Sequence, residues 1–127
     1  MAQRPFQVEA VVNLTAGDSV KDVVVCTVPV KKRFEIKFLG INGFGHPNQP
    51  LFYAVQVTTK SVLGIYPIAP TGISEIAEPE FPMRYFGSQE VALYADSKSD
   101  LIFTVARKAT TGNVRVFISL CGMLIDL

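Results

Sequence analysis

The sequence predicts an all-β fold: an antiparallel β-sandwich of about eight strands, arranged like a jelly roll. Segments in which apolar and polar residues alternate recur along the chain. Turn-forming residues separate most of these segments at intervals of roughly 8–12 residues, and no segment has the period of a long helix. The 127 residues suffice for one domain with a real core and are too few for two ordinary ones. We therefore expect a single β-sandwich domain over residues 1–127.

Five strands are expected in the first half of the chain. The segment 33–39 alternates most sharply, because Phe34, Ile36 and Phe38 fall on one face and charged residues fall on the other. Residues 40–50 hold three glycines and two prolines, which predicts a long loop after this strand. The five strands are expected at residues 6–14, 20–30, 33–39, 51–59 and 62–68.

The second half begins with an interruption of the alternation. Residues 69–87 contain three prolines and two glycines, which predicts a long connection that crosses between sheets, as a jelly roll requires. The Gly112-Asn113 pair can adopt positive φ angles and predicts a hairpin turn at residues 110–113. The remaining strands are expected at residues 90–95, 101–107 and 113–127.

The chain carries little charge for a globular domain. Apolar residues make up 49% of the sequence and charged residues 18%, against roughly 25% charged residues in an average domain. The net charge of +1 offers no electrostatic attraction to nucleic acid or to an anionic membrane surface. The basic residues at 31–33 and at 107–108 are expected to be solvated. The low charge predicts surface that is buried against other copies of the chain.

Two strands are apolar on both alternating faces, at residues 23–28 and 113–127. A strand with one wet face would alternate apolar and polar residues, so these strands are expected to be covered on both sides. The partner that covers the second side is expected to be another copy of the chain, in a trimer or a dimer. The candidate interface residues are Val23, Val25, Phe117, Met123 and Ile125.

The sequence contains no recognisable membrane span or targeting segment. Its longest nearly unbroken apolar run, residues 116–125, is about half of the roughly 20 residues that a spanning helix needs. The first ten residues lack the apolar core of a signal peptide. As written, the chain is expected in the cytoplasm, and an extracellular location would require a leader that has been removed.

The two cysteines, Cys26 and Cys121, both lie within apolar strands, where a free thiol behaves as a small hydrophobe. We expect two buried free thiols, with a disulfide as the alternative in an oxidising compartment. Two cysteines and one histidine are too few for a structural zinc site. We therefore expect neither a metal ion nor a cofactor.

The chain resembles a loose group of small, uncharacterised bacterial β-sandwich proteins in three segments: VPVKKRFEIKFLGIN at 28–42, VALYAD at 91–96 and TVARKATTGNVRVFISLCGMLIDL at 104–127. In that group a Val-Pro-x-x-Lys-Arg segment opens a central strand, and a Ser-x-x-Gly-x-Leu-Ile/Val-Asp strand ends the chain. The resemblance covers about half of the sequence and leaves out residues 43–87. It implies a sandwich fold and no particular activity, so no functional residue is carried over.

An aromatic cluster lies near the expected long connection. Aromatic rings and arginine can form a stacking platform for a sugar or anchor a protein contact, or the rings can fold back and cover the end of the core. The one histidine lies in the loop at 43–50, and histidine is the residue type whose ordinary pKa lies closest to neutral pH. The candidate ligand-binding residues are Tyr66, Phe81, Arg84, Tyr85, Phe86 and His46.

Three functions follow from these observations. A non-catalytic, homo-oligomeric structural or interaction module is favoured, because no set of residues has the pattern of a catalytic site. The alternative is a carbohydrate- or receptor-binding module that uses the loops at 43–50 and 69–87. A cupin-like enzyme is least favoured, because metal cupins use several histidines and this chain has one.

Overall fold

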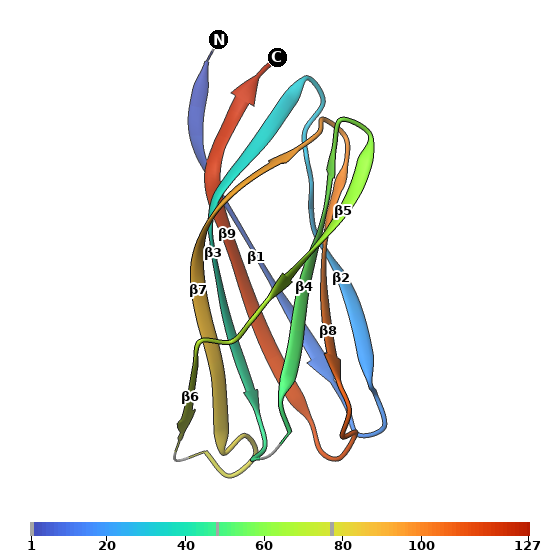
Figure 1. Cartoon of the computed structure of the whole chain (residues 1–127), viewed down its shortest axis with the longest axis vertical. Helices are drawn as coiled ribbons and strands as arrows, with labels where there is room; N and C mark the ends of the chain where they lie inside the picture. Colours follow the sequence, from blue (N-terminus) through green and yellow to red (C-terminus); the bar gives the residue numbers. More distant parts are fainter. Residues whose placement is uncertain (1, 48, 77) are drawn as a thin grey trace.

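The computed structural model describes residues 2–47, 49–76 and 78–127, and these residues form two antiparallel sheets with no helix. The sheets pack face to face in an elongated sandwich, with the two chain ends side by side at one end of it (Figure 1). The ends are adjacent because β1 (Gln3–Leu14) pairs with β9 (Val114–Asp126) over its whole length. The predicted all-β sandwich is confirmed.

Each sheet has a defined strand order. Sheet A has the order β1-β9-β3-β7-β6 and sheet B the order β2-β8-β4-β5. In sheet A the strands are β1 (Gln3–Leu14), β9 (Val114–Asp126), β3 (Lys32–Gly45), β7 (Met83–Ala95) and β6 (Gly72–Glu75). In sheet B they are β2 (Val20–Thr27), β8 (Asp100–Arg107), β4 (Leu51–Thr59) and β5 (Val62–Ile68).

The connections wind the chain back and forth between the sheets. Among the described strands, consecutive partners stay in one sheet only at β4–β5 and at β6–β7. Without the short β6, each sheet has four strands in the interleaved order of two Greek keys, which is the jelly-roll arrangement. The predicted jelly-roll-like topology is therefore confirmed, with nine strands rather than about eight.

The core lies between the sheets and is built from alternating residues of every long strand. β9 contributes the apolar set that its sequence predicts: its even-numbered residues from Val114 to Leu120, together with Leu124, are at most 1% exposed. Sheet B faces them with Leu101, Phe103 and Val105 of β8, each fully buried. The Phe103 ring stacks on the ring of Tyr53, with 6.0 Å between the ring centroids.

The loop predicted at residues 40–50 is wrong over its first half, because β3 continues through Gly45. The glycines lie inside the strand instead of forming a turn, and one of them is required by close packing. Gly43 leaves room for the side chains of Leu51 and Tyr53, since a Cβ at this position would lie 2.9 Å from Leu51 Cδ1. Asn48, also in this loop, lies outside the described residues.

The connection predicted at residues 69–87 does cross between the sheets, but residues 69–71 are enough for the crossing, and the predicted length is wrong. Gly72–Glu75 forms β6, and β7 begins at Met83 rather than near Glu90. The prolines at 79 and 82 lie between these two strands and remove no hydrogen bond from either of them. β6 is an edge strand that pairs with β7 alone. Ala77 lies outside the described residues.

The predicted orientation of Phe38 is wrong. A β-bulge between Ile36 and Phe38 shifts the alternation of β3 by one residue, against both β7 and β9. Phe34 and Ile36 point into the core as predicted, but Leu39 replaces Phe38 there, and Phe38 is 41% exposed.

The residues at 110–113 do not form a hairpin turn, because β8 lies in sheet B and β9 in sheet A. Gly112 has the positive φ that the turn needs, 77°. The expectation that Arg107 is solvated is also wrong, since this side chain is 3% exposed. Its guanidinium donates hydrogen bonds to the carbonyl oxygens of Asp18, Thr111, Thr15 and Gly112.

Candidate functional site

The outer face of sheet B is mostly apolar. It consists of the side chains that point away from the core, and five of them are more than half exposed: Val20, Val24, Phe52, Leu63 and Ile65. The register extends this surface across all four strands, because Val24 lies opposite Ile102, Ile102 opposite Gln56, and Gln56 opposite Ile65.

The charged side chains on this outer face are Asp22 and Asp100, which both lie toward the β2 side. Each accepts a hydrogen bond of 2.6 Å from a threonine hydroxyl on the neighbouring strand, Asp22 from Thr104 and Asp100 from Thr27. The β4–β5 side of the face therefore has no charge of its own.

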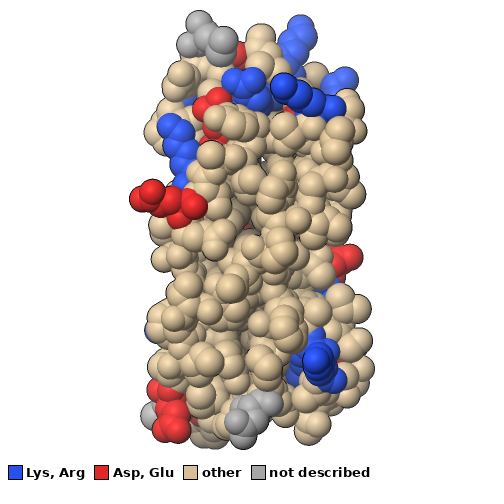
Figure 2. Space-filling model, in the orientation of Figure 1, with Lys and Arg blue, Asp and Glu red and all other residues tan. Residues whose placement is uncertain are grey.

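The β5 strand forms one of the two edges of sheet B, opposite the edge strand β2. It crosses in front of β4 in Figure 1, and the central part of the molecular surface seen from the same direction is free of charged side chains, which lie along its margins and toward its ends (Figure 2). Val62 and Ile65 are 68% and 62% exposed. An exposed, uncharged edge strand is a surface on which another strand can pair.

A groove with a volume of about 740 Å³ crosses the outer face of sheet A. Its floor is a row of small residues on three adjacent strands, because Ser119 of β9 lies opposite Gly40 of β3, and Gly40 lies opposite Ser88 of β7. A Cβ added at Gly40 would meet no atom within 4 Å, so the space above it is open. The groove thus results from three small residues that lie side by side on adjacent strands.

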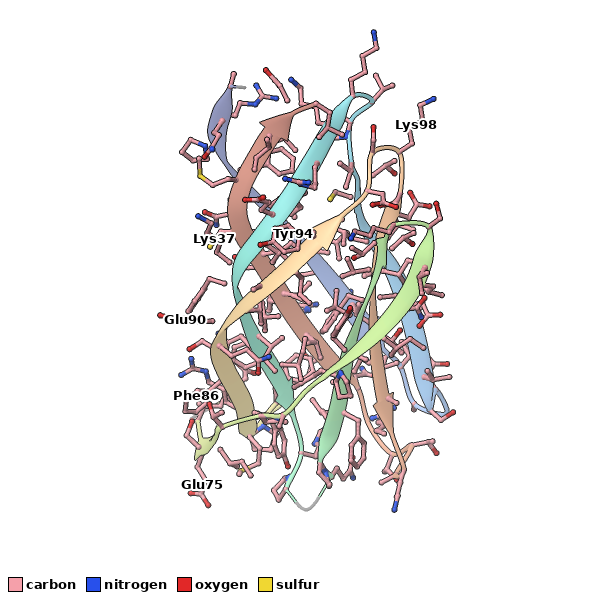
Figure 3. The ribbon with its side chains drawn as sticks, turned by 45° about the horizontal axis from the view of Figure 1, so that its top comes forward. Lys37, Glu75, Phe86, Glu90, Tyr94 and Lys98 are labelled. Atoms are coloured by element: carbon pink, nitrogen blue, oxygen red, sulfur yellow. The ribbon has the colours of Figure 1, made fainter. Side chains whose placement is uncertain are left out.

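Aromatic and polar side chains form the walls of this groove. Phe117 and Phe86 stand in the next row, on either side of Asn42. The Arg84 guanidinium lies over the Phe86 ring, 4.4 Å from its centroid, and Nε donates a 2.6 Å hydrogen bond to Asn42 Oδ1. Phe86 and Glu90 follow one another along β7 toward Tyr94 (Figure 3). The arrangement holds an aromatic surface beside fixed polar groups.

The six candidate ligand-binding residues do not form one site. Arg84 and Phe86 line the sheet A groove, but Tyr85 between them points into the core and is 3% exposed. Its hydroxyl donates a 2.7 Å hydrogen bond to the His46 carbonyl. His46 Nε2 lies 3.1 Å from the Asn113 carbonyl oxygen, at the same end of the sandwich.

The other two candidates lie elsewhere. Phe81 lines a separate depression with Phe44 and Arg115, and the Arg115 guanidinium lies 5.8 Å from the centroid of the Phe81 ring. Tyr66 belongs to β5 in the other sheet, and its ring covers Gly64. Sequence reasoning missed Asn42, Ser88 and Ser119, because nothing in the order of residues indicates which small side chains meet across three strands.

The candidate interface residues divide between the two sides of the sheets. Phe117, 42% exposed, and the half-buried Met123 lie on the outer face of sheet A. Val23 and Val25 are partly buried against the core, and Ile125 is 3% exposed. The exposed valines of β2 are instead Val20 and Val24, because the side chains of Val23 and Val25 pack against the core. The alternation of the strand changes after Val24, where a bulge interrupts its pairing with β8.

Chemistry-bearing groups are sparse in the described part of the chain. Its residues contain no group of three or more His, Cys, Asp or Glu side chains that could hold a metal ion. Cys26 and Cys121 are free and half-buried, and burial, followed by the charge of Asp100, raises the pKa of the Cys26 thiol to about 11. The described residues include no helix with the length and hydrophobicity that a membrane crossing requires.

No protein-family model and no curated protein sequence matches the chain. Among solved structures, it is similar to a chain of "Cyanophage Pam1 capsid asymmetric unit", with 12% identity and a TM-score of 0.45, over 94% of this chain and 85% of that one. It is also similar to a chain of "nora virus structure", with 10% identity and a TM-score of 0.42, over 98% of this chain and 60% of that one.

Proposed function

We propose that this chain is a non-catalytic β-sandwich that assembles with copies of itself and serves as a structural or interaction module. The observation that supports this function is the apolar surface formed by the outer face of sheet B, which carries no charged side chain on its β4–β5 side, and the adjoining edge of β5. Large exposed apolar patches on soluble proteins mark contact sites. Another copy of the chain is the partner that is always present at matching concentration.

The energetics set a minimum size for the contact. Apolar surface contributes about 25 cal/mol for each Å² that is removed from water. Association costs roughly 4–15 kcal/mol in lost freedom of motion, so about 600 Å² of apolar area offsets even the upper figure. Stable interfaces bury about 800 Å² on each partner, which is comparable with one face of a small sheet.

The molar mass in solution tests this function. Sedimentation velocity or light scattering at micromolar concentration is expected to give a multiple of the 13.9 kDa chain mass. The double variant Val24→Lys with Leu63→Lys places two charges on the outer face of sheet B and is expected to shift the protein to the monomer. The matched control, Val11→Lys with Ile73→Lys, changes two exposed positions of sheet A and is expected to keep the assembly.

A wild-type chain that stays monomeric over this range would remove the proposal. Loss of assembly in the sheet A control, with retention in the sheet B variant, would move the contact to the other face.

We propose as a second function that the groove on sheet A binds a carbohydrate. Sugar rings stack on exposed aromatic side chains while their hydroxyl groups bond to fixed polar groups, and this groove places Phe86 and Phe117 beside Asn42, Arg84 and two serines. The support differs from that for assembly, because it concerns the opposite sheet, and the two functions are compatible.

A glycan screen followed by titration tests this second function. Binding of a screened oligosaccharide is expected to weaken at least about tenfold in Phe86→Ala, which corresponds to about 1.4 kcal/mol. It is also expected to weaken in Gly40→Val, which fills the open floor. Phe52→Ala, an exposed phenylalanine of sheet B, is the matched control and is expected to bind normally. A broad screen without a saturable ligand would contradict the proposal.

A further inference from the structure

The free edge of β5 has a hydrogen-bonding pattern that follows from its turn. Lys60 and Ser61 connect β4 to β5 with φ angles of 51° and 64°. Two positive φ angles in a two-residue loop define a type I′ turn, whose flanking residues Thr59 and Val62 form a hydrogen-bonded pair. Hydrogen-bonded and non-bonded pairs alternate along an antiparallel ladder. The even-numbered residues of β5 therefore bond to β4, and the odd-numbered residues direct their backbone groups to the free edge.

This alternation determines what β5 can offer to a partner strand. Leu63 and Ile65 each present an N–H group and a carbonyl at the free edge, whereas Pro67 presents a carbonyl alone. A proline at this position removes no bond from the β4–β5 ladder, which explains why the strand tolerates it. The pairing segment is thus short, and it is limited by the turn on one side and by Pro67 on the other.

The other edge strands of the sandwich are protected against such pairing. β2 carries Lys21 and Asp22 and a bulge after Val24. β1 carries charged residues and a proline, and β6 has four residues, the last of which is Glu75. Charge, proline, bulges and short length are the usual means by which sheet edges avoid association. β5 has no charged residue and pairs with β4 without a register shift.

We propose that β5 pairs antiparallel with β5 of a second copy, about a two-fold axis that passes through Gly64. This inference rests on the proposed self-assembly and names one contact within it, at the edge of the apolar surface. Leu63 then faces the partner's Ile65, and Ile65 faces the partner's Leu63, in two hydrogen-bonded pairs. The four backbone groups that Leu63 and Ile65 present on each copy are all satisfied, and the two four-stranded sheets become one continuous sheet.

The side chains agree with this register. Val62 would lie beside the partner's Tyr66, an aromatic and β-branched pair of the kind that stabilises neighbouring strands. Leu63 would lie beside the partner's Ile65 on the outer face. The four exposed apolar side chains of β5, which are Val62, Leu63, Ile65 and Tyr66, thus all find apolar neighbours.

Other registers satisfy fewer groups. An axis at Leu63 would place Ile65 opposite the partner's Ser61, which lies in the turn. An axis at Ile65 would place Leu63 opposite the partner's Pro67, which has no N–H group, and would leave the Leu63 carbonyl unpaired. The axis at Gly64 leaves no N–H or carbonyl of Leu63 or Ile65 without a partner. A second copy is therefore the occupant that the edge fits.

Disulfide trapping tests the register. In a background with Cys26→Ser and Cys121→Ser, Leu63→Cys and Ile65→Cys chains are co-expressed and mildly oxidised. Paired residues lie about 5.5 Å apart between Cα atoms, within the range of roughly 4.4–6.8 Å that a disulfide spans. The co-expressed chains are expected to give a covalent dimer of twice the 13.9 kDa chain mass. Each variant alone is expected to stay unlinked, because identical positions are then offset along the strands.

The controls separate this inference from the proposed function. Ile65→Lys is expected to abolish the β5 contact, whereas Ile73→Lys, at a position that is equally exposed on β6, is expected to leave it intact. An oligomer without the 63–65 disulfide, and unaffected by Ile65→Lys, would overturn the β5 contact and leave self-assembly standing. A chain that is monomeric by mass and unlinked after oxidation would overturn both.

Discussion

At the scale of single residues, Arg107 is the position that departs most from expectation. It is the last residue of the strongly apolar strand β8 and precedes a lysine, so its sequence context indicates a side chain in contact with solvent. The structure instead buries it, because its guanidinium donates to four carbonyl oxygens in the turns that follow β1 and β8. A sequence carries no local signal for carbonyls that are about 90 positions away.

Arg107→Met is expected to lower the free energy of unfolding by about 3 kcal/mol, because carbonyls that now accept bonds from a charged group would lose their donor in a buried place. Urea denaturation measures this loss. Arg115→Met removes an exposed arginine with one side-chain hydrogen bond, to Asn13, and is expected to cost less than about 1 kcal/mol. Equal losses in the two variants would contradict the role of Arg107.

At the scale of elements, the strands that alternate were predictable and the irregular ones were not. The inward set of β1, β4 and β8 is the apolar set of the sequence, since one buried face imposes a period of two residues. Glycines and prolines misled the interpretation of β3, β6 and β7. Gly40 and Gly43 lie inside β3. Gly40 leaves open space in the groove and Gly43 leaves room for the side chains of Leu51 and Tyr53, and both effects depend on residues of other strands.

The bulge in β3 depends on a glycine of β9. Ile36 lies opposite Gly122 and Phe38 opposite Cys121, and a Cβ at Gly122 would lie 3.0 Å from the backbone nitrogen of Lys37 and closer still to the Glu35 carbonyl. Gly122→Ala is therefore expected to destabilise the fold by about 1–3 kcal/mol, because the obstacle is backbone. Gly40→Ala, with open space around its Cβ, is expected to be neutral or slightly stabilising.

Thermal unfolding of the two glycine variants measures this difference. A melting temperature of Gly122→Ala equal to that of the wild type would show that the bulge can relax away from β9. The comparison is controlled within one sheet, because both glycines belong to paired strands of sheet A.

At the scale of the whole molecule, the two sheets and their jelly-roll character could be predicted from the alternation, and the low charge indicated an apolar surface outside the core. The location of that surface could not. The prediction chose strands that are apolar on both faces, but Val23, Val25 and Ile125 point inward or are covered, and the exposed surface is contributed mainly by β5 and its neighbours. Exposure depends on which strand lies at an edge, which is a property of topology.

Two carboxylates with lowered pKa values contribute to the dependence of stability on pH. A hydrogen bond from Lys32 lowers the pKa of Asp126 below 3.8, and hydrogen bonds from Thr15 lower the pKa of Asp18. A lowered pKa in the folded state contributes stability that is present above the unfolded value and is lost as the pH falls through the folded value. The melting temperature is therefore expected to be flat near neutral pH and to fall below about pH 4.

The double variant Asp18→Asn with Asp126→Asn is expected to lose part of this acid dependence, which differential scanning calorimetry across pH 2–7, a range of about five units around the carboxylate pKa, would detect. An unchanged slope would assign the acid dependence to other carboxylates.

The adjacent chain ends have a practical consequence. Because β1 and β9 run side by side and Asp126 N donates to the Ala2 carbonyl at 3.0 Å, a short linker could join the two ends without bending either strand. New ends could then be opened at the Lys60–Ser61 turn, producing a circular permutant with the same sandwich. Such a rearranged chain would also place a genetically attached passenger beside the β5 edge, where its bulk would block the pairing proposed for that edge.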